Sequence, residues 1–573
     1  MAFQLSPGVN VSEVDLTTVV PAVATSVGAI AGPFQWGPVK EIKTIANEVE
    51  LVQMFGKPDN DTANNFFSAA NFLSYSGNLK AVRVVGSSAL NATTNGATGV
   101  GVLVENQTDY NQNHASGIVG TTWVAKYPGA LGNSLKVSMA DSATYSAWTY
   151  KSEFQAAPGT STYAENNIGN PYAIDELHIV VVDEDGKFSG TQGTILEKYA
   201  FVSKASDAKT ETGESNYYKD VINTKSQYIW WGNHTTTVTG TGSTWGSTIP
   251  GATGFKYASG QIAESLYAGA DANSPTSGNI EEGYDLFLSE SVDTNLIITG
   301  DAGGASSAAT VVGYVIDNIA EVKKDCIVFY SPLKADVVDN VGSEAADLVT
   351  YAGTTVNANS SYAVMDGNWK YQYDKYNDVY RWIPCNGDVA GLCARTDQTN
   401  DPWFSPAGYN RGVIKNVVKL AWNPSKAERD TIYNAGVNPI VSQPGVGTVL
   451  FGDKTSLAKP SAFDRINVRR LFIVLEKAIA TAAKFSLFEL NDEFTRAQFV
   501  GLVEPYLRDV KGRRGVYDFK VVCDETNNTP QVIDSNSFVG DIYIKPARSI
   551  NYIQLNFVAV RTGVEFSEIV GKF

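Results

Sequence analysis

Residues 361–412 read SYAVMDGNWKYQYDKYNDVYRWIPCNGDVAGLCARTDQTNDPWFSPAGYNRG, a stretch that interleaves large aromatic side chains with charges. Its aromatic residues from position 369 to 409 are Trp369, Tyr371, Tyr373, Tyr376, Tyr380, Trp382, Trp403, Phe404 and Tyr409. Large rings bring apolar area and a polar handle to cores and to interfaces alike. The stretch therefore leaves three interpretations open: packing in a core, a protein–protein interface or a carbohydrate site.

The composition is that of a folded protein of several domains. The chain has 573 residues, of which 43% are hydrophobic and 11% aromatic, and this length exceeds what one ordinary core organises. Its net charge is −16, which gives no support to nucleic-acid binding, because that function needs a basic footprint. Residues 453–573 contain 17 Lys and Arg against 15 Asp and Glu, so the acidic excess lies before them.

Several classes of function lack their signals. The first residues, MAFQLSPGVNVSEV, have no basic and apolar blocks of a signal peptide, and no run of about 18 apolar residues predicts a membrane span. The four cysteines form no CxxC pair and are expected to be buried free thiols. No zinc-binding spacing and no nucleophile motif occurs. We therefore predict a protein that is not an enzyme and that binds no metal and no cofactor.

Hydrophobic patterns divide the chain into parts. Residues 21–86 and 280–452 alternate short apolar strands with helical patterns, as in an α/β domain. Asn47 and Ser425 are predicted N-caps of helices in these segments. A helix is expected over residues 335–351, and a helical region from Val413 to Leu420. Between the two segments, residues 87–279 are rich in Ser, Thr, Asn and Gly with strand-like pieces. The sequence thus predicts a discontinuous α/β core domain with an inserted β-rich outer domain.

The last part, residues 453–573, is predicted to be a C-terminal α+β domain. Its strongest helical pattern is an apolar stripe that includes Val468, Leu471, Leu475 and Ile479. A second helix, a basic loop and alternating strands follow. The overall fold class is therefore α+β and multidomain, with terminal strands at both ends of the chain.

Seven exact strings give the chain a family resemblance. It resembles the tail sheath proteins of contractile-tailed bacteriophages, and the T4-like sheaths in particular. The strings are LSPG at 5–8, FQWGP at 34–38, DGNWKYQYDKYND at 366–378, AGLCARTD at 390–397, SPAGYNR at 405–411, FDRINVRRLF at 463–472 and ARSINY at 547–552. The inserted region matches weakly, and the chain is shorter than the T4-like sheaths.

The resemblance implies a structural subunit of the virion, assembled in the host bacterial cytoplasm. Such subunits polymerise with copies of themselves as hexameric rings stacked helically around a tail tube, with a baseplate and a tail terminator as further partners. A baseplate signal makes the sheath contract and drive the tube through the host envelope, without nucleotide hydrolysis. The implied role includes no direct contact with nucleic acid and no stable membrane insertion.

Two terminal strands lack a partner nearby in the sequence. A strand in that position must pair far away in the chain or on another chain, and strand addition to a neighbour supplies main-chain hydrogen bonds. We predict inter-subunit arms at residues 1–20 and about 545–573. Their predicted pairing residues are Val9, Val11, Val14, Ile550, Ile553, Leu555 and Phe557.

Basic residues of the C-terminal part are predicted to face the tail tube, with an ordinary solvated face as the alternative. The candidates are Arg470, Lys477 and Lys484, seven residues apart on the predicted helix, and Arg508, Lys511, Arg513 and Arg514 in the basic loop. Two other functions would require features of their own. A spike-like module that grips host glycan would need long β-repeats, and a secreted polysaccharide hydrolase would need an export signal and an acid/base pair. Neither set of features is evident.

Overall fold

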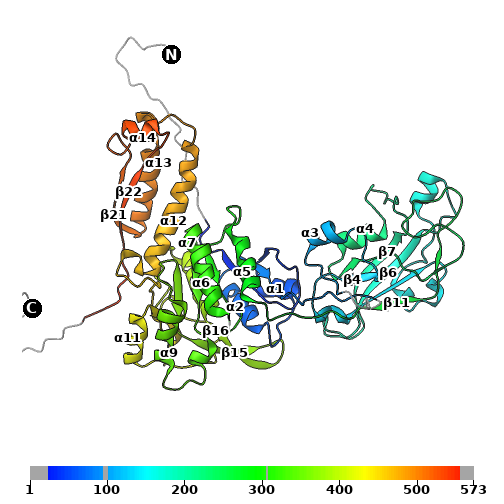
Figure 1. Ribbon diagram of the computed structural model, residues 1–573, viewed down its shortest axis with the longest axis horizontal. Helices are drawn as coiled ribbons and strands as arrows, with labels where there is room; N and C mark the ends of the chain where they lie inside the picture. The colour runs from blue at the N-terminus through cyan, green and yellow to red at the C-terminus, as the bar shows by residue number, and fades with distance from the viewer. Residues whose placement is uncertain (1–23, 95–100, 305–306, 555–573) are drawn as a thin grey trace, which may run out of the picture.

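A seven-stranded, mostly parallel sheet organises the centre of the molecule (Figure 1). The computed structural model describes residues 24–94, 101–304 and 307–554. In spatial order the strands are β18 (Val437–Asn438), β14 (Ala363–Asp366), β13 (Ile327–Tyr330), β12 (Leu296–Ile298), β1 (Gly28–Gly32), β3 (Leu79–Arg83) and β2 (Lys43–Ile45). Only β2 runs antiparallel to its neighbour. The inner strands are apolar along their length because helices cover both faces of a parallel sheet.

Helices from both halves of the chain pack on this sheet. They are α1 (Glu48–Phe55), α2 (Ala63–Leu73), α5 (Ser277–Asp285), α6 (Ala308–Tyr314), η7 (Val315–Ala320), α7 (Glu321–Lys323), α8 (Lys334–Val337), α9 (Glu344–Thr350), η8 (Tyr351–Val356), α10 (Asn386–Thr399) and α11 (Lys426–Asn434). Both predicted caps are present, since Asn47 accepts a hydrogen bond from the Glu50 amide and Ser425 forms a capping box with Glu428. One continuous hydrophobic core runs through residues 29–84 and 280–473.

The region between β3 and α5 has its own sheet and core, and lies to one side of the central sheet (Figure 1). Its four-stranded antiparallel sheet has the order β11 (Ile262–Ser265), β5 (Leu135–Asp141), β6 (Glu176–Asp183) and β7 (Thr194–Ser203). Smaller elements are α3 (Gln107–Asp109), α4 (Tyr218–Lys225), β4 (Trp123–Ala125), β8 (Ile229–Trp231), β9 (Val238–Thr239) and β10 (Tyr257–Ala258).

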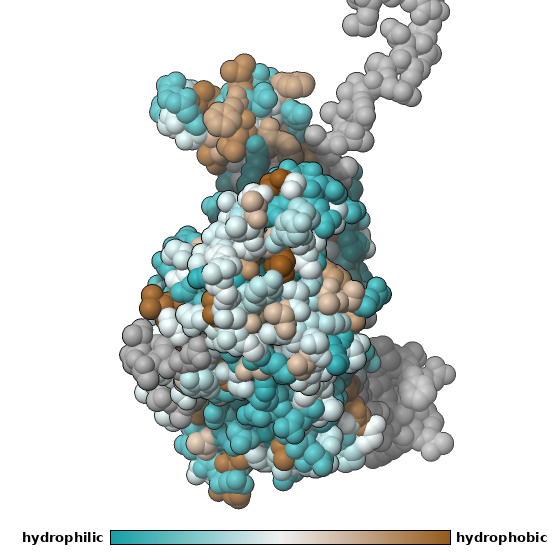
Figure 2. Space-filling view, turned by 90° about the vertical axis from the view of Figure 1, so that its right-hand side faces the viewer, coloured by the Kyte–Doolittle hydropathy of each residue, from teal (hydrophilic) through white to brown (hydrophobic). Residues whose placement is uncertain are grey.

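The chain enters and leaves this β-rich region along two backbones that lie side by side. The Gly86 amide donates to the Ala272 carbonyl at 2.9 Å, and Leu90 and Ala270 exchange two hydrogen bonds at 3.0 Å each. The region is therefore attached to the central sheet through this paired neck. Further contacts come from Trp36, which packs against Tyr127 and Phe188, and from Arg83, which donates to the Pro128 carbonyl at 2.7 Å. Its outward face is mostly hydrophilic (Figure 2).

The C-terminal part stands on the opposite side of the central sheet as a third unit (Figure 1). It consists of α12 (Ile466–Ala483), α13 (Glu493–Gly512), β21 (Val516–Val522), α14 (Pro530–Asp534) and β22 (Asp541–Pro546). A third hydrophobic core holds it together. The molecule is thus a mixed α+β protein with several sheets.

Two expectations for the core were wrong. Residues 413–418 are not helical, and β17 (Lys419–Leu420) instead adds to the hairpin of β15 (Trp369–Asp374) and β16 (Val379–Pro384). The Val418 amide donates to the Tyr371 carbonyl and the Ala421 amide to the Trp369 carbonyl, each at 2.9 Å. These long-range backbone bonds override the local helical pattern. The helix expected over residues 335–351 is likewise divided, into α8 and α9.

Candidate functional site: the C-terminal unit and its joint to the core

The C-terminal unit is built on two helices that pack through apolar stripes. Leu471 and Leu475 of α12 belong to one buried cluster with Val503 and Leu507 of α13. The hairpin of β21 and β22 covers this pair, and Phe519 is among its residues that pack against the cluster. An isolated two-stranded hairpin is only marginally stable in water, so the helices hold the sheet in place.

The β21–β22 sheet offers two strand edges. The strands pair antiparallel with each other, for example Phe519 opposite Ile544 and Val521 opposite Ile542. Among residues 24–94, 101–304 and 307–554, no further strand joins this sheet. An open edge presents a row of N–H and C=O groups that can pair with another chain. The unit is therefore suited to strand addition on both sides.

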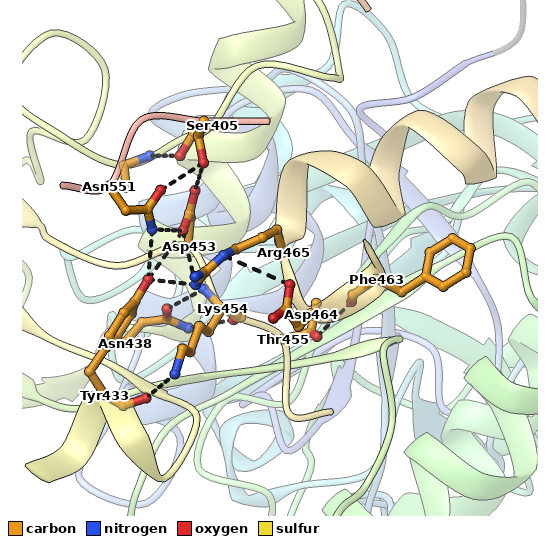
Figure 3. Close-up of polar contacts among 12 residues, drawn as sticks. Ser405, Tyr433, Asn438, Asp453, Lys454, Thr455, Phe463, Asp464, Arg465 and Asn551 are labelled. Carbon is orange, nitrogen blue, oxygen red and sulfur yellow. Dashed lines mark hydrogen bonds and ion pairs between the residues drawn. The ribbon is translucent and has the colours of Figure 1, made fainter. Parts of the chain in front are cut away.

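A buried carboxylate, Asp453, organises the joint between the core and the C-terminal unit (Figure 3). The Ser549 hydroxyl donates to its Oδ2 at 2.7 Å, and Asn551 Nδ2 donates to its Oδ1 at 3.2 Å. Asn551 also donates to the Tyr433 hydroxyl at 3.1 Å, which accepts a further bond from Arg465 at 2.7 Å. Three passages of the chain meet here: the end of α11, the segment that leads into α12, and the segment that follows β22.

A second set of bonds fixes the backbone of the same joint. Asn438 Nδ2 donates to the Lys454 carbonyl at 2.8 Å, and the Lys454 amide donates to Asn438 Oδ1 at 2.7 Å. Lys454 Nζ donates to the Tyr433 carbonyl at 2.7 Å. Residues 549–551, near the end of the described chain, are therefore held against a rigid part of the core.

Replacing Asp453 by alanine should release residues 547–554 from the core. The substitution removes the acceptor shared by Ser549 and Asn551, and each charge-assisted bond lost contributes about 1.5–3 kcal/mol. Hydrogen–deuterium exchange of these residues should become faster, while the core helices keep their protection. Asp464→Ala is the matched control, because its carboxylate lies near Arg465 without touching residues 549–551. Equal exchange in the two variants would contradict the role of Asp453.

Most of the predicted arm residues lie outside the described part of the chain. This applies to Val9, Val11, Val14, Leu555 and Phe557. Ile550 and Ile553 are described, and 83% and 79% of their surfaces are exposed. They belong to no strand of this chain, so their apolar side chains are available to another molecule.

The predicted tube-facing residues do not form one surface. Arg470 is only 3% exposed, and its guanidinium pairs with Asp397 at 2.6 Å and donates to the Cys393 carbonyl at 3.1 Å. A buried arginine cannot contact a separate protein, so its assignment as tube-facing is wrong. Lys477 is partly buried and pairs with Asp293, which ties α12 to the core.

The remaining basic candidates are exposed but separated. Lys484 directly follows α12, whereas Arg508 to Arg514 lie around the end of the antiparallel α13, about 30 Å long. There Arg513 pairs with Asp401 of the core, and Lys511 pairs with Asp518 at 2.9 Å. Lys484 and the basic loop thus mark opposite ends of the helical pair.

The connection between α12 and α13, together with the first turn of α13, exposes an apolar tip that the sequence did not predict. Phe485, Leu487, Phe488, Leu490 and Phe494 are between 63% and 105% exposed. Brown and tan residues gather at this end of the molecule in Figure 2. Monomeric proteins rarely expose such a group without using it. These large apolar residues cluster where the chain passes from one helix to the next, and they do not continue the apolar stripe of either helix. That cluster is the feature of the sequence that could have indicated an exposed apolar surface.

The aromatic stretch divides into a buried and an exposed set. Trp369 is buried, with its indole nitrogen bonded to the Pro332 carbonyl at 2.8 Å, and Trp403 belongs to the core of the C-terminal unit. Tyr371, Tyr373, Tyr380 and Trp382 instead form a ladder on the outer face of β15 and β16, with ring centroids 4.8–5.5 Å apart. Packing in the core therefore accounts for part of the stretch, and an open face for the rest.

The inner face of the same hairpin carries a buried ion pair. Lys370 Nζ lies 2.9 Å from Asp388 Oδ2 and 3.0 Å from Oδ1, and both side chains are fully buried. Tyr75 donates to the same carboxylate at 3.1 Å, and the Lys415 carbonyl accepts from Lys370 at 2.9 Å. Burial raises the pKa of Asp388, and Lys370 opposes that rise. This network fastens β15 to α10 and to the residues that follow α2.

The described residues contain little that resembles a reactive centre. No group of three His, Cys, Asp or Glu side chains in residues 24–94, 101–304 and 307–554 could hold a metal ion. All four cysteines are free and buried, as predicted. No helix in the described part of the chain is long and apolar enough to cross a membrane.

Comparisons with known proteins decide the family. The chain is 35% identical to the tail sheath protein of Enterobacteria phage T4, over 99% of both chains. It belongs to the phage tail sheath proteins. The tail sheath protein of Vibrio phage KVP40 is also 35% identical, over 99% of this chain and 100% of the relative. Members of this family are structural components of the virion.

Three descriptions of tail sheath domains match separate ranges. The phage tail sheath protein central domain matches residues 273–456, the phage tail sheath C-terminal domain matches 458–559, and the tail sheath protein Gp18 domain III N-terminal region matches 25–84. The alignment with the T4 sheath protein spans 673 positions, more than the 573 residues here, so that relative contains segments this chain lacks.

Solved structures agree on the fold. The sheath tail protein of Listeria innocua has a TM-score of 0.52 at 12% identity, and the match covers 93% of this chain and 97% of that chain. The sheath tail protein of Desulfitobacterium hafniense has the same TM-score at 13% identity, covering 94% of this chain and 100% of that chain. The tail sheath fold is thus shared across much lower sequence identity.

Proposed function

We propose that this chain is the repeating subunit of a contractile tail sheath. Its copies assemble as hexameric rings that stack helically around a tail tube, in the host cytoplasm, and the assembly shortens to drive the tube through the host envelope. The observation that carries the proposal is the β21–β22 sheet, whose two edges have no partner strand among the described residues. Sheath-family membership supplies the context.

The arms are proposed to link neighbouring subunits. Residues 1–20 and the part of the C-terminal segment, predicted from about 545 onward, that follows β22 add as strands to the β21–β22 sheets of adjacent copies. Main-chain bonds there provide strength and alternate side chains provide register. Several links per subunit make the mesh hard to separate, because each later link forms within an existing assembly. The fixed point at Asp453 would set where the C-terminal arm begins.

The parts of the chain are proposed to have separate tasks. Residues 21–86 and 280–452 form the discontinuous core domain, 87–279 the outer domain, and 453–573 the inner domain that faces the tube. Three hydrophobic clusters, each drawn mainly from one of these parts, and the ranges of the family matches support this division. The baseplate and the tail terminator are proposed partners at the two ends of the polymer. An extended sheath held by a kinetic barrier needs no nucleotide.

Electron microscopy of negatively stained purified protein tests the proposal directly. Striated tubes or rings with six-fold symmetry are expected. Dispersed monomers or trimers at every protein concentration would contradict a sheath subunit and favour a spike-like module.

Charge reversal should weaken the association of sheath with tube. The proposed contacts are the exposed residues Lys484, Arg508, Lys511, Arg513 and Arg514, without the buried Arg470. Replacing Lys484, Arg508 and Arg514 by glutamate should weaken binding to isolated tubes by about tenfold or more at low salt, since exposed pairs contribute up to about 1 kcal/mol each. The effect should shrink as salt screens the charges.

The control is Lys426→Glu, which reverses an exposed charge at the start of α11 in the core. Tube binding is measured by co-sedimentation, and polymer formation without tube should stay unchanged in all variants. Unchanged co-sedimentation of the triple variant at low salt would remove these residues from the tube interface.

A further inference from the structure

A cavity of about 410 Å³ lies outside the carboxyl ends of β12 and β13. The loops that follow these strands, residues 299–304 and 331–335, supply much of its wall. The strand order reverses between β1 and β12, next to this cavity. From β1 the chain adds β3 on one side, and from β12 it adds β13 and β14 on the other side. Ligands of doubly wound sheets bind at this kind of position.

Most of the cavity wall is apolar and held in place by the fold. The apolar lining includes Ala302, Ala308, Val312, Leu333, Val338 and Trp369. The Trp369 ring is oriented by the bond from its indole nitrogen to the Pro332 carbonyl. Val312 is fixed in α6 and fully buried on its inner side. The cavity is large enough for a small organic molecule, whose apolar part these side chains would surround.

One carboxylate in the wall has only neutral partners. Asp301 accepts hydrogen bonds from Asn64 Nδ2 at 2.9 Å, from Asn65 Nδ2 at 3.4 Å and from the Gly303 amide at 3.3 Å. Burial raises its pKa, and these amide donors oppose the rise. The side chains that donate to this carboxylate are both amides, from Asn64 and Asn65. A carboxylate in such surroundings favours a positively charged group.

The same carboxylate argues against a phosphate ligand. The turn Gly300-Asp-Ala-Gly-Gly304 precedes α6 and has the glycines of a phosphate loop without its lysine. Asp301 would repel an anion there. Lys334 and Asp339 also line the cavity, and both are exposed. The ammonium group of Lys334 is therefore a competitor for a cation in this cavity.

We propose that this cavity binds a small organic cation, in which a primary ammonium group pairs with Asp301 and an apolar body fills the space beside Val312, Leu333 and Trp369. The binding site is independent of the arms and of the tube-facing residues. The charge of Asp301 selects for the ammonium group at one end of the cavity. The shape and apolar surface of the rest of the cavity select for the apolar body of the ligand.

Three probes of similar size test the proposal on the full-length protein by isothermal titration calorimetry. They are 2-phenylethylammonium, its neutral counterpart 2-phenylethanol and the anion phenylacetate. The cation should bind about 10- to 100-fold more tightly than the neutral probe, as expected for a hydrogen bond to a charged group in a buried site. The anion should bind more weakly than either.

Variants of the cavity locate the binding. Asp301→Asn should reduce the affinity for the cation to that for 2-phenylethanol, and Val312→Phe should weaken both probes by filling the space. Lys334→Gln should strengthen cation binding, because it removes a competing charge. Asp317→Asn is the matched control, since this exposed carboxylate lies on η7 outside the cavity.

Equal binding of the charged and neutral probes by the unmodified protein would overturn the proposal, and so would no binding of the cation. This comparison needs no variant, so it holds even where Asp301→Asn fails to fold. Cation affinity should also be equal in polymerised and unpolymerised protein. Loss of cation binding on polymerisation would overturn the proposal that the cavity binds a small molecule. It would indicate that a side chain of a second copy occupies the cavity in the polymer.

Discussion

Removal of residues 1–20 should leave a folded monomer that cannot polymerise. These residues precede the described core, and β1 begins at Gly28, so their loss removes none of the described strands of the central sheet. The β21–β22 edge that they are proposed to fill would stay open in every copy. Circular dichroism should show native helix content, and negative-stain images should show no tubes at concentrations at which the full chain forms them.

Two further variants test whether residues 1–20 act through strand pairing or only through their length. A protein whose residues 1–20 are scrambled keeps their composition and loses the alternation of Val9, Val11 and Val14, and it should also fail to polymerise. A protein with isoleucine at these three positions keeps the pattern and should form tubes. Normal tubes from the shortened protein would show that the N-terminal arm is dispensable.

Asp388→Ala should cause a large loss of stability, about 3–5 kcal/mol. The substitution leaves the ammonium group of Lys370 buried without its counter-charge, and breaking one partner of a buried pair carries a cost of this size. It also removes the acceptor of the Tyr75 hydroxyl. Urea unfolding followed by circular dichroism measures the change as a lower transition midpoint.

The control for this substitution is the exposed pair of Lys375 and Glu48, 3.2 Å apart. Lys375→Ala should change stability by no more than about 1 kcal/mol, because water and salt screen such pairs. The double substitution Lys370→Met with Asp388→Leu should recover much of the loss, since it removes both buried charges together. A midpoint for Asp388→Ala equal to that of Lys375→Ala would contradict the structural role of the pair.

Local signals were sufficient to predict many elements. Asn47 and Ser425 satisfy amides of the helices they begin, and the apolar stripe with Leu471 and Leu475 faces a partner helix. These features depend on residues within a turn or two along the chain. The strings shared with phage sheaths supplied the family, which the relatives confirm.

Long-range contacts explain what could not be predicted. Arg470 and Lys484 belong to one series of basic residues spaced seven apart, yet Arg470 is buried and Lys484 is exposed. The partner of Arg470 is Asp397, which lies 73 residues away in the sequence. Residues 413–420 have a helical pattern, but residues 413–418 are not helical and Lys419 and Leu420 pair with β15 as a strand. The contacts of Asp453 with Ser549 and Asn551 span almost 100 residues. No local pattern records such partners.

The paired neck at Gly86 and Ala272 brings together the two ends of the outer region where they join the core. Because the two backbones are already held side by side, a foreign domain whose own ends lie close together could replace the intervening residues without stretching the central sheet. The entropy of closing a longer loop rises only slowly with its length. Sheath relatives that differ in length could therefore exchange their outer parts as interchangeable modules, and an engineered sheath could carry a passenger on every subunit.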